Sequence, residues 1–321
     1  MDTSRTNRLL SLQKDFFQHL GHKGRSVNTL KNYKTDLDCF NNYLSSKNIT
    51  TRFEDFSIPQ IIEYGKFLEV KYNSDNSRRR RVQALRLFFD YLVERGIFRD
   101  NPVKKIPTSP KFVDIPRPTT FSNVKTLWLH LLEESKTKKS RLDLVTIRRN
   151  QLIFALIYLG GLKVSDMAKL KREHFSFLKN PRVMILHPKR DPYSVELPAV
   201  FRSIYESYID ILDKIMKDNR HDFSEILFNA NAHKILSGGL SARGIELIFD
   251  SWRHKLVMEV TPKSLRQSCI YTWLKNEVND TIIKEKLGLS PSYSLKPYKD
   301  SLSENIFNDD FVEITFHSLM G

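Results

Sequence analysis

The chain has 321 residues, 40% of them hydrophobic, which is long for one domain and sufficient for two. It carries 52 lysines and arginines against 37 aspartates and glutamates, a net charge of +15 that favours polyanionic partners, either nucleic acid or an anionic membrane. The apolar content argues against disorder, and no run approaches the ~20 apolar residues that span a bilayer. A merely soluble basic protein is the alternative explanation of the charge.

Residues 8–106 have the periodicity of helices. The segment SVNTLKNYKTDLDCFNNYL begins at Ser26, an N-cap residue, and spaces its apolar residues three and four apart. The segment RVQALRLFFDYLVERG repeats this pattern and ends on Gly96, which favours a helix stop. Residues 1–106 carry a net charge of +8 and the remainder +7, so both halves are basic.

Five prolines between residues 102 and 118 interrupt the helical pattern. Proline has no backbone N–H and does not fit a helix interior, so their spacing predicts an extended connector. The second half opens with the helical segment RRNQLIFALIYLGGL. Residues 183–187 and 193–197 then form two strand-like runs around a turn, after which we expect helices from Pro198 to about Leu287.

Four segments of the second half carry a pattern in fixed order: LIYLGGLKVSDMAKLK, VMILHPKRDPYSVELP, TPKSLRQS and LGLSPSYSLKPY. Together they resemble the tyrosine recombinases, the family of phage integrases and Xer-type recombinases. The two helical segments of the first half are similar to that family's core-binding domain. The resemblance extends over nearly the whole chain, and the order and spacing of the segments make it specific.

The resemblance implies a mainly α fold with a small β component that forms a clamp around duplex DNA. It implies a helical, SAM-like core-binding domain at 1–106, a proline-rich linker at 107–118 and a catalytic domain at 119–300. The tail at 301–321 would contact a neighbouring protomer through Phe307, Phe311 and Ile314, which lie at helical spacing. As partners it implies duplex DNA and either a homotetramer or a partner recombinase, with no membrane.

In this family a tyrosine attacks a DNA phosphodiester, leaving a 3′-phosphotyrosyl link and a free 5′ hydroxyl, so rejoining needs no ATP and no metal. Tyr298 matches the nucleophile, and Arg266 matches the second catalytic arginine. Guanidinium groups suit phosphate geometry and offset the charge of the transition state. The hairpin lysine matches Lys189 or Arg190; we prefer Lys189, because a lysine can donate a proton to the leaving oxygen.

Three matched positions depart from the family pattern. Lys163 replaces the first arginine and loses the guanidinium fork. Lys263 replaces a histidine, which is a mild change because lysine occurs there in some members. Leu289 replaces a histidine or tryptophan and cannot donate a hydrogen bond, a loss that typically costs about 3–4 kcal/mol. The alternative to an active recombinase is therefore a weakened or inactive homologue that binds DNA or regulates a partner.

Other residues keep simpler interpretations beside the functional one. Tyr293 is the competing nucleophile. The run Arg78, Arg79, Arg80 and Arg81 is either a solvated face or a phosphate-binding patch; we favour the patch, because positive charge near a helix start opposes the macrodipole. The histidines complete no metal site, and the two cysteines, Cys39 and Cys269, have no metal-type spacing. The N-terminus lacks a signal-peptide core, so we expect a cytoplasmic protein. We expect no cofactors. An unrelated basic, helical RNA-binding protein is the third alternative.

Overall fold

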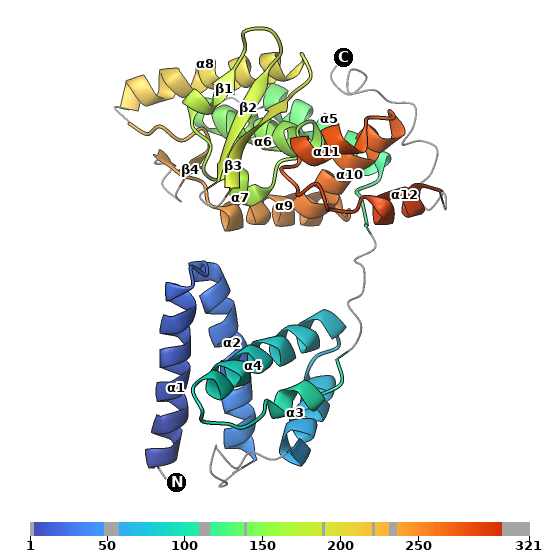
Figure 1. Cartoon of the computed structure of the whole chain (residues 1–321). Helices are drawn as coiled ribbons and strands as arrows, with labels where there is room; N and C mark the ends of the chain where they lie inside the picture. Colours follow the sequence, from blue (N-terminus) through green and yellow to red (C-terminus); the bar gives the residue numbers. More distant parts are fainter. Residues whose placement is uncertain are drawn as a thin grey trace. The chain divides into compact units, whose positions relative to one another are not determined.

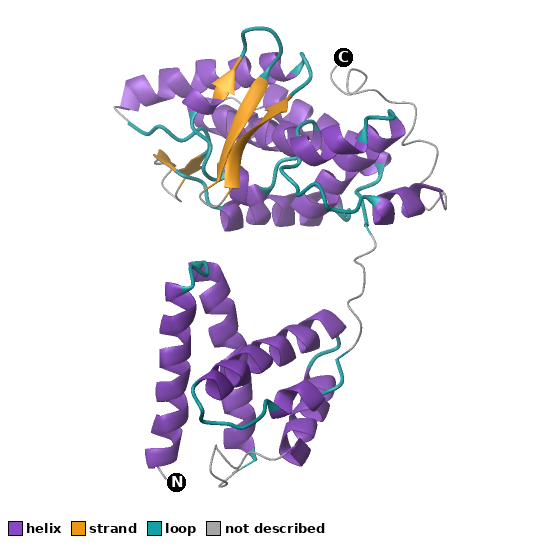
Figure 2. Cartoon of the chain, viewed as in Figure 1, coloured by secondary structure: helices purple, strands orange, loops and turns teal. Residues whose placement is uncertain are grey.

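The computed structural model of the chain describes residues 3–47, 58–108, 116–137, 140–187, 190–219, 222–230 and 236–303. It divides into two compact units, residues 1–113 and 114–321, each with its own hydrophobic core. The fold is mainly α with a small β component, as predicted. Among the described residues, strands occur in the second unit alone (Figure 2).

The first unit is built from helices α1 (Thr3–His22), α2 (Val27–Ser46), α3 (Ile58–Lys71) and α4 (Asp75–Glu94). The predicted N-cap is present, since the Ser26 side chain accepts a hydrogen bond from the Thr29 amide. Aromatic rings fill the core between the helices; Phe16 meets Phe88 edge-on at 5.4 Å between centroids. Gly96 ends the last helix with a φ of 71°, a left-handed conformation that glycine adopts at little cost.

The prediction of an extended connector through all five prolines is wrong at both ends. Pro102–Lys105 form a short 3-10 helix, η2, which is capped by Asn101 and buries Val103 in the first core. Arg86 of α4 donates to the carbonyls of Val103 and Ile106, at 3.3 and 2.7 Å. Pro116 and Pro118 are buried in the second unit. Pro102 therefore belongs to the first folded unit, and Pro116 and Pro118 belong to the second. The spacing of the prolines does not reveal these tertiary contacts.

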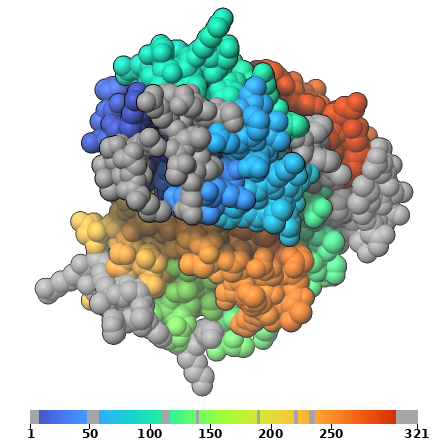
Figure 3. Space-filling view, turned by 90° about the horizontal axis from the view of Figure 1, so that it is seen from below, coloured from blue at the N-terminus to red at the C-terminus, as the bar shows by residue number. Residues whose placement is uncertain are grey.

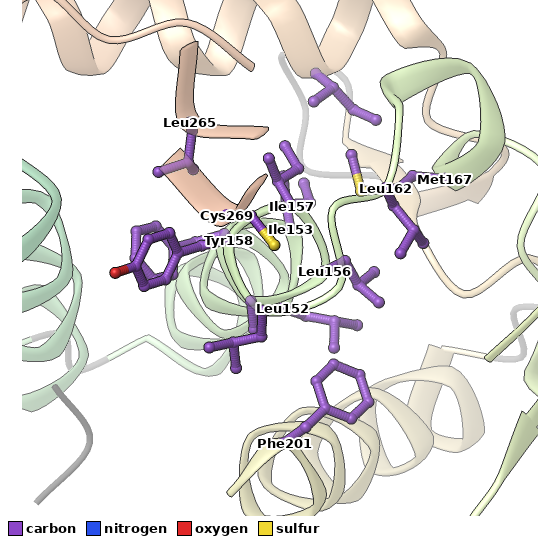
Figure 4. Close-up of a cluster of buried hydrophobic side chains, with 14 of the residues drawn as sticks. Leu152, Ile153, Leu156, Ile157, Tyr158, Leu162, Met167, Phe201, Leu265 and Cys269 are labelled. Carbon is purple, nitrogen blue, oxygen red and sulfur yellow. The ribbon is translucent and has the colours of Figure 1, made fainter. Parts of the chain in front are cut away.

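The second unit is organised around α6 (Arg141–Tyr158), whose residues 151–158 are all buried. A helix buried on every side lies at the centre of its domain. Helices α5 (Phe121–Thr137), α8 (Phe201–Asn219) and α10 (Pro262–Lys275) pack around it. Figure 4 shows Leu265 and Cys269 of α10 on one side of α6 and Phe201 of α8 on the other.

A three-stranded antiparallel sheet, in the order β1 (Phe175–Ser176), β2 (Arg182–His187), β3 (Arg190–Glu196), lies beside these helices (Figure 1). The predicted hairpin is therefore present, with Val183 opposite Val195 and both side chains buried. The 3-10 helix η3 (Arg172–His174) precedes the sheet. Helix α7 (Val164–Met167) contacts β2 and links the sheet to α6.

The expectation of uninterrupted helices from Pro198 to Leu287 is wrong. A second antiparallel pair, β4 (Phe228–Ala230) and β5 (Leu236–Gly238), separates α8 from the following helix. Strands of three residues are too short to show a period of two. The helices α9 (Ala242–Leu256), α11 (Asp280–Lys286) and α12 (Lys296–Ser303) complete the described chain, and the predicted tail contact at Phe307, Phe311 and Ile314 lies outside the described residues.

Helix α9 is amphipathic. Its residues Ile245, Phe249 and Trp252 are buried, while Arg243 pairs with Glu246 at 3.1 Å on the opposite face. Figure 3 shows that part of the second unit's surface, in orange, comes from this helix. No helix in the described part of the chain has the length and apolar character needed to cross a membrane.

A buried carboxylate in the first unit gives a pH-dependent prediction. Asp36 is 1% exposed, and one of its oxygens accepts from Arg80 at 2.9 Å, while the other has no hydrogen-bond partner in the part of the chain that the structure describes. Burial raises the pKa of Asp36 above 3.8, and Arg80 opposes that rise. The unfolded chain therefore loses this proton at lower pH than the folded chain. The contribution of Asp36 to stability is complete below pH 3.8 and decreases as pH rises through the folded pKa.

We expect Asp36→Asn to gain stability relative to the parent as pH rises through that window. Urea titrations followed by circular dichroism report both units, and tryptophan fluorescence reports the second, which holds all three tryptophans. The exposed Asp38 of the same helix supplies the control, Asp38→Asn. A stability difference between Asp36→Asn and the parent that does not vary with pH would contradict the prediction.

Candidate active site

The candidate site is assembled by α10, whose start is well defined by the sequence. Thr261 caps the helix by accepting from the Ser264 amide at 3.0 Å, and the Ser264 hydroxyl accepts from the Thr261 amide at 2.9 Å. Pro262 occupies the first helical position, where its missing N–H costs nothing. The helix then presents Lys263, which is exposed, and Arg266, which lies one turn further and is largely buried.

Arg266 is fixed by the chain turn that follows α6. Its Nε donates to the carbonyl of Gly161 at 2.5 Å. Gly161 has a φ of 63°, in the left-handed region, and a Cβ at this position would lie 3.0 Å from Trp273 and Leu287. Glycine is therefore required at this turn for its backbone conformation and for space.

One nitrogen of the same guanidinium has no partner. Nη2 of Arg266 is buried and makes no hydrogen bond within the described structure. Buried polar groups are nearly always paired, and a buried donor without an acceptor is costly. An oxyanion placed against this nitrogen would supply the acceptor, and guanidinium is the side-chain group best matched to phosphate oxygens.

Tyr298 lies beside Arg266. Its side chain is 9% exposed and packs on the ring of Tyr271, with centroids 5.7 Å apart. Burial, with a smaller effect of Tyr293, raises the pKa of Tyr298 to about 12, although Arg266 and Gln267 act to lower it. Tyr298 is therefore a neutral phenol at physiological pH, held next to a cation.

The groups that act on the pKa of Arg266 also place it next to Tyr298. Burial lowers the pKa of its guanidinium, while Tyr298, Cys269, Tyr193 and Asp166 act in the opposite direction. The hydroxyl of Tyr193 donates to Asp166 Oδ2 at 3.3 Å, which connects β3 to α7. The structure thus brings together residues from α7, β3, α10 and α12 that are far apart in sequence.

The other predicted residues take varied places. Lys163 is half-buried at the N-terminal boundary of α7, two residues after the carbonyl that binds Arg266. Leu289 follows α11, where Gly288 has a φ of 57° and the Leu289 amide donates to the Lys284 carbonyl at 2.8 Å. Its side chain packs against the hydrophobic core.

The hairpin candidates are described only in part. Lys189 lies outside the described residues. Arg190 begins β3 with its backbone opposite His187, and its side chain is likewise outside the description. The choice between Lys189 and Arg190 stays a prediction.

Most of the basic run in α4 is engaged inside the first unit. Arg78 donates to the Tyr72 carbonyl at 2.8 Å and pairs with Asp75. Arg81 donates to Ser77 and stacks on the Tyr72 ring, 3.7 Å from its centroid. Arg80, which pairs with Asp36, remains half exposed, and Nη1 of Arg79 is buried with no hydrogen-bond partner among the described residues. The run is thus partly structural, which its sequence does not reveal.

Three residues of the site were missed by sequence reasoning: Asp166, Tyr193 and Gln267. Asp166 lies three residues after Lys163 in the matched segment KVSD, and Gln267 follows Arg266, so proximity to the motifs was the available signal. Tyr193 had none. The described residues contain no cluster of three or more histidine, cysteine or acidic side chains suited to a metal ion.

Comparisons with known proteins show what the chain resembles. The family described as Phage integrase, N-terminal SAM-like domain matches residues 13–96. Tyrosine recombinase XerD of Listeria innocua is 24% identical over 284 residues, which cover 85% of this chain and 89% of the relative. The chain is therefore similar to the tyrosine recombinases over most of its length.

Solved structures show the same fold. XerH site-specific recombinase bound to a palindromic difH substrate, in a post-cleavage complex, aligns with a TM-score of 0.68 at 13% identity, covering 88% of this chain and 78% of XerH. A lambda integrase tetramer bound to a Holliday junction aligns with a TM-score of 0.61 at 16% identity, covering 89% and 79%. The recombinase fold therefore surrounds the cluster of Arg266 and Tyr298.

The turn at Gly161 yields a stability prediction. Gly161→Ala adds a methyl group 3.0 Å from Trp273 and Leu287 in a left-handed residue, whereas Gly239→Ala, with a φ of 82°, enters open space. The left-handed conformation costs about 1–2 kcal/mol in both variants, and only the first adds overpacking of about 1–3 kcal/mol. Urea titration followed by tryptophan fluorescence measures the difference, and equal losses in the two variants would contradict the packing account.

Proposed function

We propose that the chain is a DNA strand-exchange protein of the tyrosine recombinase type. It would bind duplex DNA and break and rejoin strands through a 3′-phosphotyrosyl intermediate at Tyr298. The observation that carries this proposal is the buried Arg266 guanidinium, whose Nη2 lacks an acceptor, beside the Tyr298 hydroxyl. A scissile phosphate placed between them would complete the hydrogen bonding of the arginine and meet the nucleophile.

Each residue has a proposed role. Arg266 would neutralise a non-bridging oxygen of the phosphate, and Lys163 and Lys263 would add positive charge beside it. Tyr298 would attack phosphorus, and its proton must leave because the pKa of the free hydroxyl is about 12. Lys189, or Arg190 in its place, would donate a proton to the leaving oxygen.

The domain roles follow the same proposal. Residues 1–106 would form the core-binding domain, 107–118 the linker and 119–300 the catalytic domain of a cytoplasmic clamp on DNA. The net charge of +15 would draw it to the phosphate backbone, with binding that weakens steeply as salt increases. Within the basic run, two arginines would contact DNA phosphates. Arg80 has a half-exposed side chain, and Arg79 has an Nη1 without a hydrogen-bond partner among the described residues. Strand exchange would require a tetramer, formed either by four copies of this chain or together with a partner recombinase.

A second function is supported by Lys163 and Leu289. A lysine binds phosphate as a point charge without the fork of arginine, and Leu289 packs in the core where the family has a hydrogen-bond donor. A chain with these two residues would retain the fold and the phosphate site and cleave slowly or not at all. In that case it would act by binding DNA or by modulating an active partner.

Covalent trapping distinguishes the two functions. The protein is mixed with nicked duplexes from its host's DNA and washed with denaturing detergent, and the retained DNA is sequenced. We expect adducts with the parent and none with Tyr298→Phe, which removes the nucleophilic oxygen while leaving native DNA binding intact. Adducts that persist in Tyr298→Phe would move the nucleophile elsewhere, first to Tyr293. DNA retained only by native washes in both proteins would support the second function.

The departures from the family pattern can be tested by reversing them. Lys163→Arg combined with Leu289→His should raise the adduct rate, by roughly a hundredfold or more if each change restores one donor to the transition state. Single-turnover cleavage of the trapped duplex measures the rate. Lys169→Arg, an exposed lysine beyond α7, is the control for added guanidinium charge. An unchanged rate in the double variant would show that Lys163 and Leu289 do not limit cleavage.

A further inference from the structure

Tyr298 is carried by α12, a helix of eight residues. A helix of this length is not stable by itself in water, so contacts with the rest of the second unit determine its orientation. Any group that fixes the orientation of α12 therefore also fixes the candidate nucleophile. The contacts of α12 include an apolar set and an ion pair.

The apolar contacts hold one side of α12 against the core of the second unit. Leu302 packs against that core, and the ring of Tyr298 meets the ring of Tyr271 with centroids 5.7 Å apart. Leu295, immediately before the helix, is 2% exposed, and its carbonyl accepts from the amides of Tyr298 and Lys299 at 3.0 and 3.1 Å. Apolar contacts are non-directional, so they exclude water without fixing the rotation of a short helix.

The ion pair joins α12 to α11. Nζ of Lys299, the residue after Tyr298, lies 2.8 Å from Oδ2 of Asp280, the first residue of α11. The two side chains are 52% and 39% exposed, so the pair is accessible to solvent and to salt. It is a directional contact at the residue next to the candidate nucleophile.

Helix α11 gives this contact a fixed end. Ile283 of α11 is fully buried, and the helix contacts both β3 and α10. Asn279 caps its start by accepting from the Thr281 amide at 2.9 Å. The first turn of α11 is therefore well defined, and Asp280 offers Lys299 a partner whose backbone is held by the core.

We propose that Asp280 and Lys299 are positioning residues for the candidate nucleophile, and that their ion pair holds α12 in the orientation that presents Tyr298 to a phosphate. The inference rests on the proposed function, because cleavage is the step that this orientation serves. A short helix with few contacts has other orientations of similar free energy, and catalysis requires the productive one. The pair increases the fraction of molecules in that orientation.

The first test needs no cleavage. Hydrogen exchange of the α12 amides is followed by mass spectrometry, without DNA, in the parent and in Asp280→Asn. We expect α12 to exchange about two- to fivefold faster in the variant, the effect of one exposed ion pair. High salt should bring the parent to the exchange rate of the variant, because salt screens exposed charges.

The control for this exchange measurement is Asp218→Asn. It breaks another exposed ion pair between two helices, that of Asp218 in α8 with Arg141 in α6, at 3.4 Å. This variant should leave the exchange of α12 unchanged. Equal exchange of α12 in the parent and in Asp280→Asn would overturn the proposal.

The second test measures single-turnover adduct formation with nicked duplex in Asp280→Asn, Lys299→Gln and the double variant. Asp280→Asn removes a negative charge and so favours DNA binding, which means that a slower rate cannot come from weaker binding. We expect this variant to form adducts about two- to fivefold more slowly than the parent. In the Lys299→Gln background the same change should have no effect, because the pair is already broken.

Two results of the second test would overturn the proposal. One is an Asp280→Asn variant that forms adducts as fast as the parent or faster. The other is an equal slowing by Asp280→Asn in both backgrounds, which would assign the effect of Asp280 to its negative charge at the N-terminus of α11.

The two tests separate this proposal from the proposed function. A parent that forms no Tyr298-dependent adduct, together with α12 exchange that responds to Asp280→Asn, would remove the proposed cleavage and support the ion pair as the contact that orients Tyr298. A parent that forms adducts, together with unchanged exchange in Asp280→Asn, would overturn the role of the ion pair alone.

Discussion

The hydrogen bond from Arg266 to the Gly161 carbonyl is the interaction on which the site depends. It joins α10 to the turn after the central helix, and it holds a long, flexible side chain in one orientation. The turn itself requires a glycine, since the backbone is left-handed and Trp273 and Leu287 leave no room for a Cβ. Fixing one edge of the guanidinium leaves Nη2 buried and unpaired, so the fold keeps a donor available at a cost in stability.

That cost is consistent with a site organised for an anion. Preorganised donors stabilise developing charge without having to reorient during the reaction. The neighbouring tyrosine is held as a neutral phenol, because burial outweighs the opposing effects of Arg266 and Gln267 on its pKa. Beside this neutral phenol, the buried Nη2 of Arg266 has no hydrogen-bond acceptor among the described residues, so a phosphate oxygen could pair with it. The proposed phosphate binding would use the same arrangement whether or not cleavage follows.

The fold was predictable where local signals were strong. The N-cap at Ser26 and the stop at Gly96 each have a local cause in capping chemistry, and the strand-like runs at 183–187 and 193–197 predicted the pairing of β2 with β3. The β4–β5 pair was not predictable, because three-residue strands show no alternation. The 3-10 helix at Pro102–Lys105 was missed because its stability comes from Arg86 and from burial of Val103 in the first core.

The candidate site, like the fold, was predictable only in part. Arg266 and Tyr298 were found through the family's spacing, which encodes a contact between two helices that composition alone does not reveal. Gln267 and Tyr193 were missed because their partners, Arg117 and Asp166, are distant in sequence and ordinary in type. The basic run at 78–81 shows the opposite error. Its charge suggested a ligand, and the fold supplies Asp75, Asp36 and backbone carbonyls for much of it.

The most direct measurement is a crystal structure of the Tyr298→Phe variant bound to a duplex recovered from the parent protein. The account predicts a DNA phosphate with one non-bridging oxygen within hydrogen-bond distance of Arg266 Nη2, and with phosphorus facing the ring edge of residue 298. A duplex bound elsewhere on the second unit, with Arg266 Nη2 still buried and unpaired, would contradict the central claim that this arginine holds the phosphate against the tyrosine.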